Sequence, residues 1–238
     1  IETKVSGNNI TFTLPKNGWY VLTVNDNQKL FLFAHAAKKA PQGKQVMSVM
    51  DCVTESTGKT VQTAELQKAL DEASKSGKTL IFPRGIYLSG MLTIGSNTDI
   101  YLADGAMIKG TSEPDSYPVD AGRKESGGTN GEFMTFSRLI FVNNAQNVKI
   151  RGLGTIDGNG STLRNQKRPI HLIRVCNSKN VLIEDVILRD PASWNTHILY
   201  SEDVTIRGVK IMNDANVPNT DGFDPDASRH VLIDGCFS

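Results

Sequence analysis

Apolar residues along most of the chain recur with a period of two in short runs, which is typical of β-strands. Beyond residue 79, five such runs align as apolar–variable–apolar tripeptides: Ile100-Tyr101-Leu102, Val148-Lys149-Ile150, Val181-Leu182-Ile183, Val204-Thr205-Ile206 and Val231-Leu232-Ile233. The intervals between their first residues are 48, 33, 23 and 27 residues, and a polar, glycine-rich segment at 111–131 lengthens the first of them. Four of the five are followed two residues later by Gly or Asp: Gly152, Asp185, Gly208 and Gly235.

A repeat in the twenties that contains several short strands predicts a solenoid, in which like residues of successive coils stack. We therefore expect an all-β fold, a right-handed parallel β-helix over residues 45–238. The alternative is an antiparallel sandwich, which would need hairpin turns where the sequence has signals spaced for coils. In the β-helix, the first and third tripeptide positions should point inward: Val148, Ile150, Val181, Ile183, Val204, Ile206, Val231 and Ile233.

One segment has helical rather than strand periodicity. In residues 63–76 the apolar side chains form a single stripe: Leu66, Ala69, Leu70 and Ala73. Thr63 is the expected N-cap and Gly77 the expected C-terminal stop. Because this helix directly precedes the first coil, we expect it to cap the open apolar end of the solenoid.

The N-terminal segment has a different pattern. Residues 9–14, 19–24 and 29–34 read as short strands, and polar turn signals separate them. This predicts a small antiparallel β domain over residues 1–44.

Composition and charge narrow the functional classes. Lys and Arg number 26 against 25 Asp and Glu, and this balance argues against a nucleic-acid-binding surface. The chain contains no apolar run of the roughly 18 residues that a membrane span requires. Three widely spaced cysteines without a CxxC pair predict neither a disulfide framework nor a zinc site, and no histidine pair has ligand spacing. We expect a monomer without metal or cofactor.

The densest acidic stretch covers residues 219–226. In a strand, Asp224 and Asp226 would share one face, whereas Gly222 would bend Asp221 away from them. An ordinary polar loop is the alternative that composition favours.

Asn219-Thr220-Asp221-Gly222 resembles the NTDG signature of glycoside hydrolase family 28, the polygalacturonases. Other segments agree with that family or with related β-helix enzymes: Leu80–Tyr87, Gly154–Gly160, Arg168-Pro169 and Pro191–His197. The resemblance covers about residues 50–238. It implies a right-handed parallel β-helix and inverting hydrolysis of α-linked galacturonic acid bonds in pectin. In such enzymes carboxyl groups flank the scissile bond about 6.5–9.5 Å apart, which leaves room for a water molecule.

The resemblance also implies site residues. Asp221 would be a catalytic, water-activating carboxylate, with Asn219 and Asp224 contacting substrate beside it. Trp194 and His197 lie on one expected loop, where they either contact the sugar or pack locally. Arg168, in a basic cluster with Arg164 and Lys167, either attracts a polyanion or belongs to a solvated loop.

The family's Asp-Asp pair, Gly-His-Gly and Arg-x-Lys follow NTDG, and none occurs before Ser238. We therefore expect the chain to correspond to the N-terminal part of such an enzyme and to be catalytically incomplete alone. A secreted or periplasmic location is expected for a protein that acts on a polysaccharide.

Three other functions stay open. Residues 12–18 and 30–34 are similar to the small β domain of family 49 dextranases, which would imply a neutral glucan substrate. A β-helix lyase would need a calcium cluster facing a basic residue, which NTDG fits less well. A β-helix that binds glycans without cleaving them is the remaining alternative.

Overall fold

The computed structural model describes residues 1–25, 28–118, 125–126, 133–134 and 137–238. The chain divides into two compact units, Ile1–Ala40 and Pro41–Ser238, four residues before the boundary expected from the sequence. Much of the polar segment at 111–131 lies outside the described residues. Within the described part of the chain, no helix has the length and apolar character that a membrane crossing requires.

The first unit consists of two antiparallel hairpins. β1 (Thr3–Ser6) pairs with β2 (Asn9–Phe12), and β3 (Gly18–Val24) pairs with β4 (Gln28–Ala34). The Trp19 and Phe33 rings meet edge to face across the second hairpin, with 5.9 Å between their centroids. Such aromatic cross-strand pairs stabilise hairpins that lack a large core.

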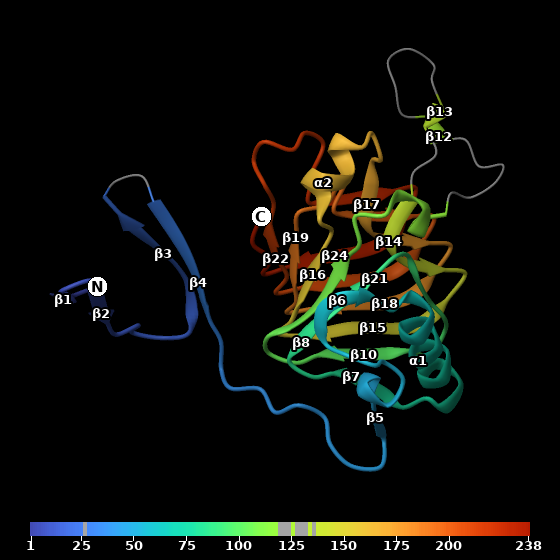
Figure 1. Cartoon of the computed structure of the whole chain (residues 1–238), viewed down its shortest axis with the longest axis horizontal. Coiled ribbons are helices and arrows are strands. Elements are labelled where there is room, and N and C mark those ends of the chain that lie inside the picture. The colour runs from blue at the N-terminus through green and yellow to red at the C-terminus, as the bar shows by residue number, and fades with distance from the viewer. Residues whose placement is uncertain (26–27, 119–124, 127–132, 135–136) are drawn as a thin grey trace. The chain divides into compact units, whose positions relative to one another are not determined.

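The second unit is the right-handed parallel β-helix that the repeat predicted, and its strands form three stacked sheets (Figure 1). The seven-stranded sheet contains β5 (Val46–Ser48), β7 (Thr79–Phe82), β10 (Asp99–Leu102), β15 (Gln146–Gly152), β18 (Lys179–Glu184), β21 (Glu202–Arg207) and β24 (Arg229–Asp234). The six-stranded sheet contains β6 (Thr57–Val61), β8 (Gly85–Ser89), β11 (Ala106–Gly110), β16 (Thr155–Asp157), β19 (Ile187–Arg189) and β22 (Lys210–Met212). The five-stranded sheet contains β9 (Leu92–Ile94), β14 (Ser137–Asn143), β17 (Ile170–Cys176), β20 (Thr196–Leu199) and β23 (Phe223–Asp226).

Shorter elements join or flank the coils. They are η1 (Val49–Asp51), η2 (Pro114–Ser116), α2 (Gly160–Asn165) and the antiparallel pair β12 (Glu125–Ser126) and β13 (Phe133–Met134). The longer connections, 158–169, 190–195 and 213–222, all run from the six-stranded to the five-stranded sheet.

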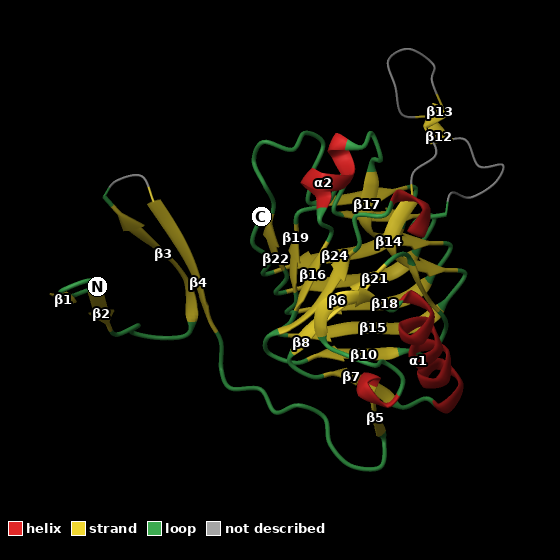
Figure 2. Cartoon of the chain, viewed as in Figure 1, coloured by secondary structure: helices red, strands yellow, loops and turns green. Residues whose placement is uncertain are grey.

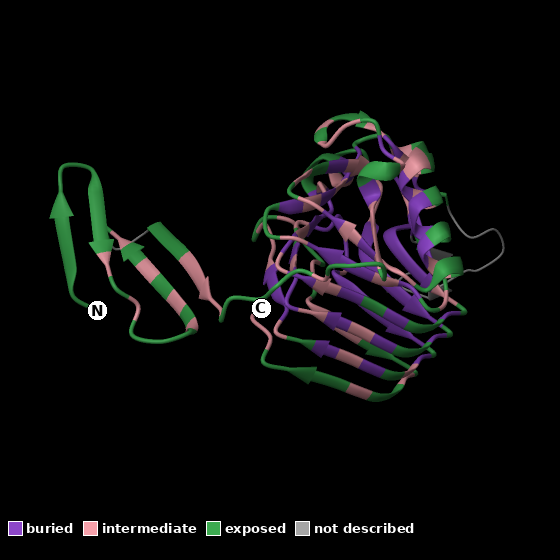
Figure 3. Ribbon diagram, turned by 90° about the horizontal axis from the view of Figure 1, so that it is seen from below, coloured by how far each residue is buried: buried purple, intermediate pink, exposed green. Residues whose placement is uncertain are grey.

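Stacked aliphatic residues fill the inside of the coils, where Figure 3 shows the buried positions. Six of the predicted inward residues are at most 1% exposed: Val148, Ile150, Val181, Ile183, Val204 and Ile206. In the last coil the prediction was wrong for Ile233, which is 41% exposed, whereas Val231 is half-buried and packs against the core. β24 is the edge strand of its sheet, so only one neighbouring strand covers it among the described residues.

The helix α1 covers Thr63–Ser76, as the apolar stripe predicted, and packs against β7 and β9 of the first coils (Figure 2). It ends at Gly77, whose φ of 65° is left-handed. The expected N-cap was wrong, because Gln62 occupies that position and its side chain binds the 54–55 backbone instead. Thr63 begins the helix, and its Oγ1 accepts a hydrogen bond from the Gly90 backbone N–H (2.7 Å).

The corners between the five- and seven-stranded sheets are short and repetitive. The four that follow β14, β17, β20 and β23 each have a residue of left-handed backbone, with φ between 46° and 49°: Asn144, Asn177, Tyr200 and Ala227. The next residue in the last three corners is a serine whose hydroxyl accepts a hydrogen bond from the backbone N–H of the preceding coil, at 2.9–3.1 Å: Ser178, Ser201 and Ser228. These bonds satisfy backbone donors that the sheets leave unpaired. They also fix the spacing of the coils.

Candidate active site

The outer face of the five-stranded sheet carries one row of polar and aromatic residues in register. Phe141, Arg174, His197 and Asp224 lie side by side on β14, β17, β20 and β23. Ile173 and Val175 flank Arg174 in sequence and belong to the core, so Arg174 points outward. The row therefore runs across four coils and ends at the NTDG segment.

A second row lies three residues earlier in each coil. Arg138 pairs in register with His171, and the Trp194 ring stacks on His171 with 5.2 Å between centroids and 23° between planes. The backbone N–H of Asn195 donates to the carbonyl oxygen of Asp221 (2.8 Å), so Asp221 continues this row next to Trp194. The two rows bring Trp194, His197, Asp221 and Asp224 together.

Three rings form a compact cluster between the rows. His197 lies edge to face against both Trp194 (5.0 Å between centroids) and His171 (5.4 Å). Both histidines are at most 2% exposed. Burial lowers the pKa of His171 to about 3, and the charges of His197 and Arg138 add to the effect. His171 is therefore a neutral imidazole at physiological pH.

The two acidic residues at the end of the rows have different environments. Asp221 is exposed, whereas Asp224 is half-buried and its Oδ2 has no hydrogen-bond partner among the described residues. Burial, together with the smaller effect of the nearby Asp221 charge, raises the pKa of Asp224 to about 6. His197 Nε2 on β20 also lies 3.7 Å from Oδ2 of Asp226, which is on β23 with Asp224. A carboxyl group whose pKa is raised toward neutral pH, beside an exposed carboxyl group, is an arrangement suited to acid–base chemistry.

A pair of amides holds the connection that leads to Asp221. Asn213 Nδ2 donates to the carbonyl oxygen of Thr220 (2.6 Å), and Asn195 Nδ2 donates to Asn213 Oδ1 (3.2 Å). Asn195 is fully buried, so this contact ties the connection to the coil below it. Asn219 is exposed in left-handed conformation, with φ of 59°.

The basic cluster expected from the sequence is used partly in local structure. Arg168 Nη2 donates to the carbonyl oxygens of Pro114 (2.9 Å) and Tyr117 (3.4 Å). Arg164 Nη1 donates to the carbonyl oxygen of Ala192 (2.9 Å). A substrate contact by Arg168 stays a prediction.

The sequence reading missed Arg138 and Arg174, which are 0% and 2% exposed. The Arg138 guanidinium lies 3.9 Å from the centroid of the Phe141 ring, a cation–π contact. A signal for both was present: the pairs 138/141, 171/174, 194/197 and 221/224 recur at intervals of 33, 23 and 27 residues. These are the intervals of the buried tripeptides, so the rows could have been found by aligning the coils.

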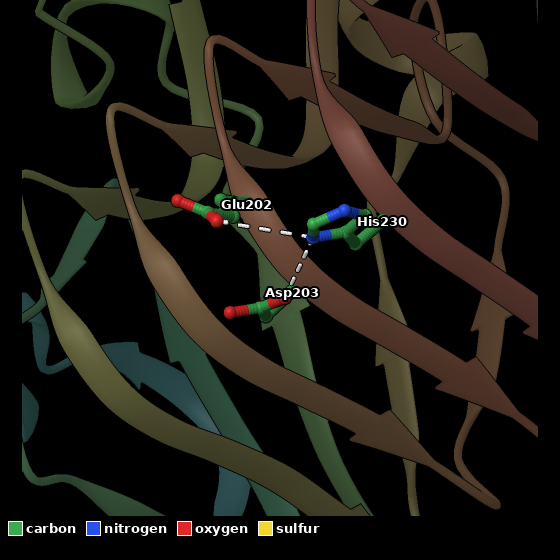
Figure 4. Close-up of side chains that lie close together, drawn as sticks. All are labelled: Glu202, Asp203 and His230. Atoms are coloured by element: carbon green, nitrogen blue, oxygen red, sulfur yellow. Dashed lines mark hydrogen bonds and ion pairs between the residues drawn. The ribbon is translucent and has the colours of Figure 1, made fainter.

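The structure also brings together a group that the metal search by sequence spacing missed. Glu202, Asp203 and His230 place one ligand atom each within 4.8 Å of one another, and Figure 4 shows them on two neighbouring coils. His230 Nδ1 lies 3.1 Å from Asp203 Oδ1 and 3.8 Å from Glu202 Oε1. Lys179 and Arg229 already pair with these carboxylates, so the charge of the group is balanced. We interpret it as an ion-pair network at the surface.

The sequence profile described as Glycosyl hydrolases family 28 matches residues 96–237, more than half of the chain and all of both rows. The chain belongs to glycoside hydrolase family 28. A Vitis vinifera protein named "Probable polygalacturonase" is 30% identical over 194 residues, which cover 76% of this chain and 39% of the relative. An endo-polygalacturonase of Pectobacterium parmentieri is 25% identical and is matched over 76% of this chain and 50% of its own length.

Among solved structures, a Yersinia enterocolitica family 28 exopolygalacturonase superimposes with a TM-score of 0.69 at 20% identity. The match covers 89% of this chain and 45% of that one. This similarity shows the shared β-helix. The chain thus spans between 39% and 50% of the length of these curated relatives.

Proposed function

We propose that this chain provides the N-terminal part of the substrate site of a pectin-degrading enzyme, which hydrolyses α-linked galacturonic acid bonds with inversion. The observation that carries the proposal is the convergence of the two rows on the NTDG segment, where Asp221 lies exposed beside Trp194 and Asp224 beside His197. In this proposal Asp221 activates the attacking water. A carboxylic acid on the opposite side of the bond protonates the leaving oxygen.

The charges of the rows favour an acidic polysaccharide over the neutral glucan considered above. Arg138 and Arg174 lie on the two coils that precede Trp194 and Asp221 in the stack. Both guanidiniums are almost inaccessible, so in this proposal they contribute positive potential along the rows rather than a direct substrate contact.

The aromatic cluster fits a role as sugar platform. Trp194 is half-buried and is held by the stacked His171 ring behind it, which fixes the orientation of the indole. A fixed aromatic face binds the C–H face of a sugar ring at little entropic cost. Asn219, Asp224, His197 and Arg168 are the remaining proposed substrate contacts. The proposed location is secreted or periplasmic, since a polymeric substrate lies outside the cytoplasm.

The test measures reducing-sugar release from polygalacturonate and from dextran by protein that carries this chain together with the family's later motifs. Asp221→Asn should lower release from polygalacturonate by roughly 10²–10⁴-fold, the usual contribution of acid–base assistance. The matched control is Asp104→Asn, since Asp104 is an exposed aspartate whose carboxylate pairs with Arg84 on the surface. NMR of the first products should show inverted anomeric configuration.

Three results would contradict the proposal. Equal or faster release from dextran would assign a neutral glucan. Unsaturated products would indicate a lyase. An unchanged rate in Asp221→Asn, with the circular dichroism spectrum preserved, would remove Asp221 from the chemistry.

A further inference from the structure

A surface pocket of about 520 Å³ lies on the six-stranded sheet and on the connections that lead from it to the five-stranded sheet. Part of its lining is a row in register on four successive strands: Lys109, Asp157, Arg189 and Met212. The residues that precede them are core residues: Ile108, Ile156, Leu188 and Ile211. Because side chains alternate along a strand, the row points outward. The volume of the pocket falls within the roughly 300–1,000 Å³ that is typical of small-molecule sites.

Hydrogen bonds hold the charged groups of the pocket in place. Arg189 donates from Nε and Nη2 to Asp190 Oδ2 (2.7 and 2.5 Å), and its Nε lies 3.5 Å from Asp157 Oδ2. Asp157 is 7% exposed, and its Oδ1 accepts from the Asn159 backbone N–H (2.8 Å). Asp190 Oδ1 accepts from the Asp214 backbone N–H (2.9 Å). A ligand would therefore meet groups already ordered, which reduces the entropic cost of binding.

These bonds argue against a metal ion in the pocket. The oxygens of Asp157 and Asp190 are held by Arg189 and by backbone N–H groups, as described above. Asp214 accepts from the Asn216 backbone N–H (2.9 Å) and from Ser161 Oγ (3.3 Å). A divalent cation would have to displace donors from all three carboxylates.

The charge of the pocket argues against an anionic ligand as well. Three carboxylates face two cations, Lys109 and Arg189, so the pocket carries a net negative charge. The groups left to bind a ligand are of both kinds. The donors are the Lys109 ammonium, which has no ion pair among the described residues, and the side-chain NH2 group of Asn159; the acceptor is the Ser161 hydroxyl oxygen, whose proton goes to Asp214. Met212 adds an apolar surface. Sugar hydroxyls both donate and accept, and sugar C–H faces pack on apolar groups.

We propose that this pocket binds a neutral saccharide and forms a second carbohydrate site, on a different sheet from the site proposed for cleavage. The two sites would select different sugars, because buried arginines line one and net negative charge the other. A protein with two such sites would be retained on a polysaccharide that contains both neutral and acidic sugars, because the second contact becomes intramolecular after the first. The binding proposal does not depend on the proposed hydrolysis.

The test uses the 238-residue chain labelled with ¹³C at its methionine methyl groups. The Met212 methyl reports on the pocket, and the Met91 methyl, which packs against Phe141, Cys176 and Leu199, reports on the five-stranded sheet. The probes are galactobiose and digalacturonate, which have the same ring stereochemistry and differ in their carboxylates. Galactobiose should shift Met212 saturably without shifting Met91. Digalacturonate should bind at Met212 at least threefold more weakly, since like charges repel.

Variants separate this site from nonspecific binding. Lys109→Gln should weaken galactobiose binding at Met212 by roughly 2- to 10-fold, the value of a hydrogen bond. Lys149→Gln is the matched control, because Lys149 is an exposed lysine on β15 of the seven-stranded sheet, and it should have no effect. The proposal is overturned if galactobiose gives no saturable shift at Met212, if digalacturonate binds there equally well, or if Lys109→Gln leaves the affinity unchanged.

Discussion

The five-stranded and seven-stranded sheets are built from the same coils, yet their outer faces differ in kind. On the seven-stranded sheet the outward residues are largely exposed ion pairs, such as Arg207 with Asp234 (3.3 Å) and Glu184 (4.0 Å). On the five-stranded sheet the outward positions hold buried Arg138, His171 and Arg174. Inward, both sheets contribute the same kind of aliphatic residue. The inward-pointing strand residues thus determine the fold, and the outward-pointing residues are left available for binding and catalysis.

The largest effect on stability is expected from substitution of an inward-pointing strand residue. Ile183 is fully buried between Ile150 and Ile206, so Ile183→Ala should lower the free energy of unfolding by roughly 2–5 kcal/mol. Leu182, its outward neighbour on β18, is half-buried, and Leu182→Ala should cost less than about 1 kcal/mol. Urea denaturation of both variants measures the difference. A similar loss of unfolding free energy in the two variants would contradict the view that the inward residues alone determine the stability of the coils.

The next effect concerns the buried imidazole of the active-site face. The unfolded chain takes up a proton on His171 near pH 6.5, whereas the folded chain does so only near its depressed pKa of about 3. Stability contributed by His171 is therefore present above pH 6.5 and lost as pH falls toward 3. Between pH 7 and pH 4 the titration of His171 should lower the free energy of unfolding of the wild type by about 3 kcal/mol. His171→Asn should lack this part of the decrease.

The control for this experiment is His230→Asn, because the His230 side chain is 70% exposed on the seven-stranded sheet. Its stability profile between pH 7 and pH 4 should follow that of the wild type. If His171→Asn also follows the wild type, the imidazole is protonated in the folded protein and the pKa assignment is wrong.

Asp224 should produce a smaller effect of opposite sign. Its folded-state pKa of about 6 lies above the unfolded value, so its favourable contribution is present below about pH 4 and lost as pH rises through 6. Asp224→Asn should therefore stabilise the protein at pH 7 by about 1 kcal/mol, after allowance for partial exposure, and have no effect at pH 4. Thermal unfolding at both pH values tests this. Destabilisation at pH 7 would indicate that the ionised carboxylate is needed for the fold.

The smallest effect is expected on the exposed face of the seven-stranded sheet. Arg207→Gln breaks the contacts to Glu184 and Asp234, but the Arg207 side chain is 51% exposed, so the loss should stay below about 1 kcal/mol. The loss should shrink further in 0.5 M salt because of screening. A salt-independent loss above 2 kcal/mol would show that this face, too, contains a buried network.

The coil architecture could be predicted from the sequence because it depends on a local, repeated pattern. The tripeptides fall on β10, β15, β18, β21 and β24, and the stripe of α1 is buried as expected. Three of the glycine or aspartate positions noted after the tripeptides adopt left-handed corners, with φ of 64°, 61° and 57°: Asp185, Gly208 and Gly235. Gly152 has a φ of 116° at the same corner.

The candidate site was only partly predictable, because it depends on register between coils. The NTDG segment could be found as a linear motif, whereas the proximity of Arg174 and His197 follows from β17 pairing with β20. The strands of the six-stranded sheet were even harder to predict from the sequence. β16, β19 and β22 have three residues each, too few to show a period, and the pocket on them went unnoticed.

The serine ladder and the left-handed corners have a consequence for how such a protein can vary. From β14 onward, two of the three corners of each coil are two residues long. A residue inserted there would break a hydrogen bond of the Ser178, Ser201 or Ser228 hydroxyl or shift a left-handed position. We therefore expect insertions and deletions to be tolerated best at the third corner, in the connections 158–169, 190–195 and 213–222. These connections border both the NTDG segment and the saccharide pocket. Sequence drift in this family can thus reshape what the protein binds, coil by coil, without altering the stack that holds it together.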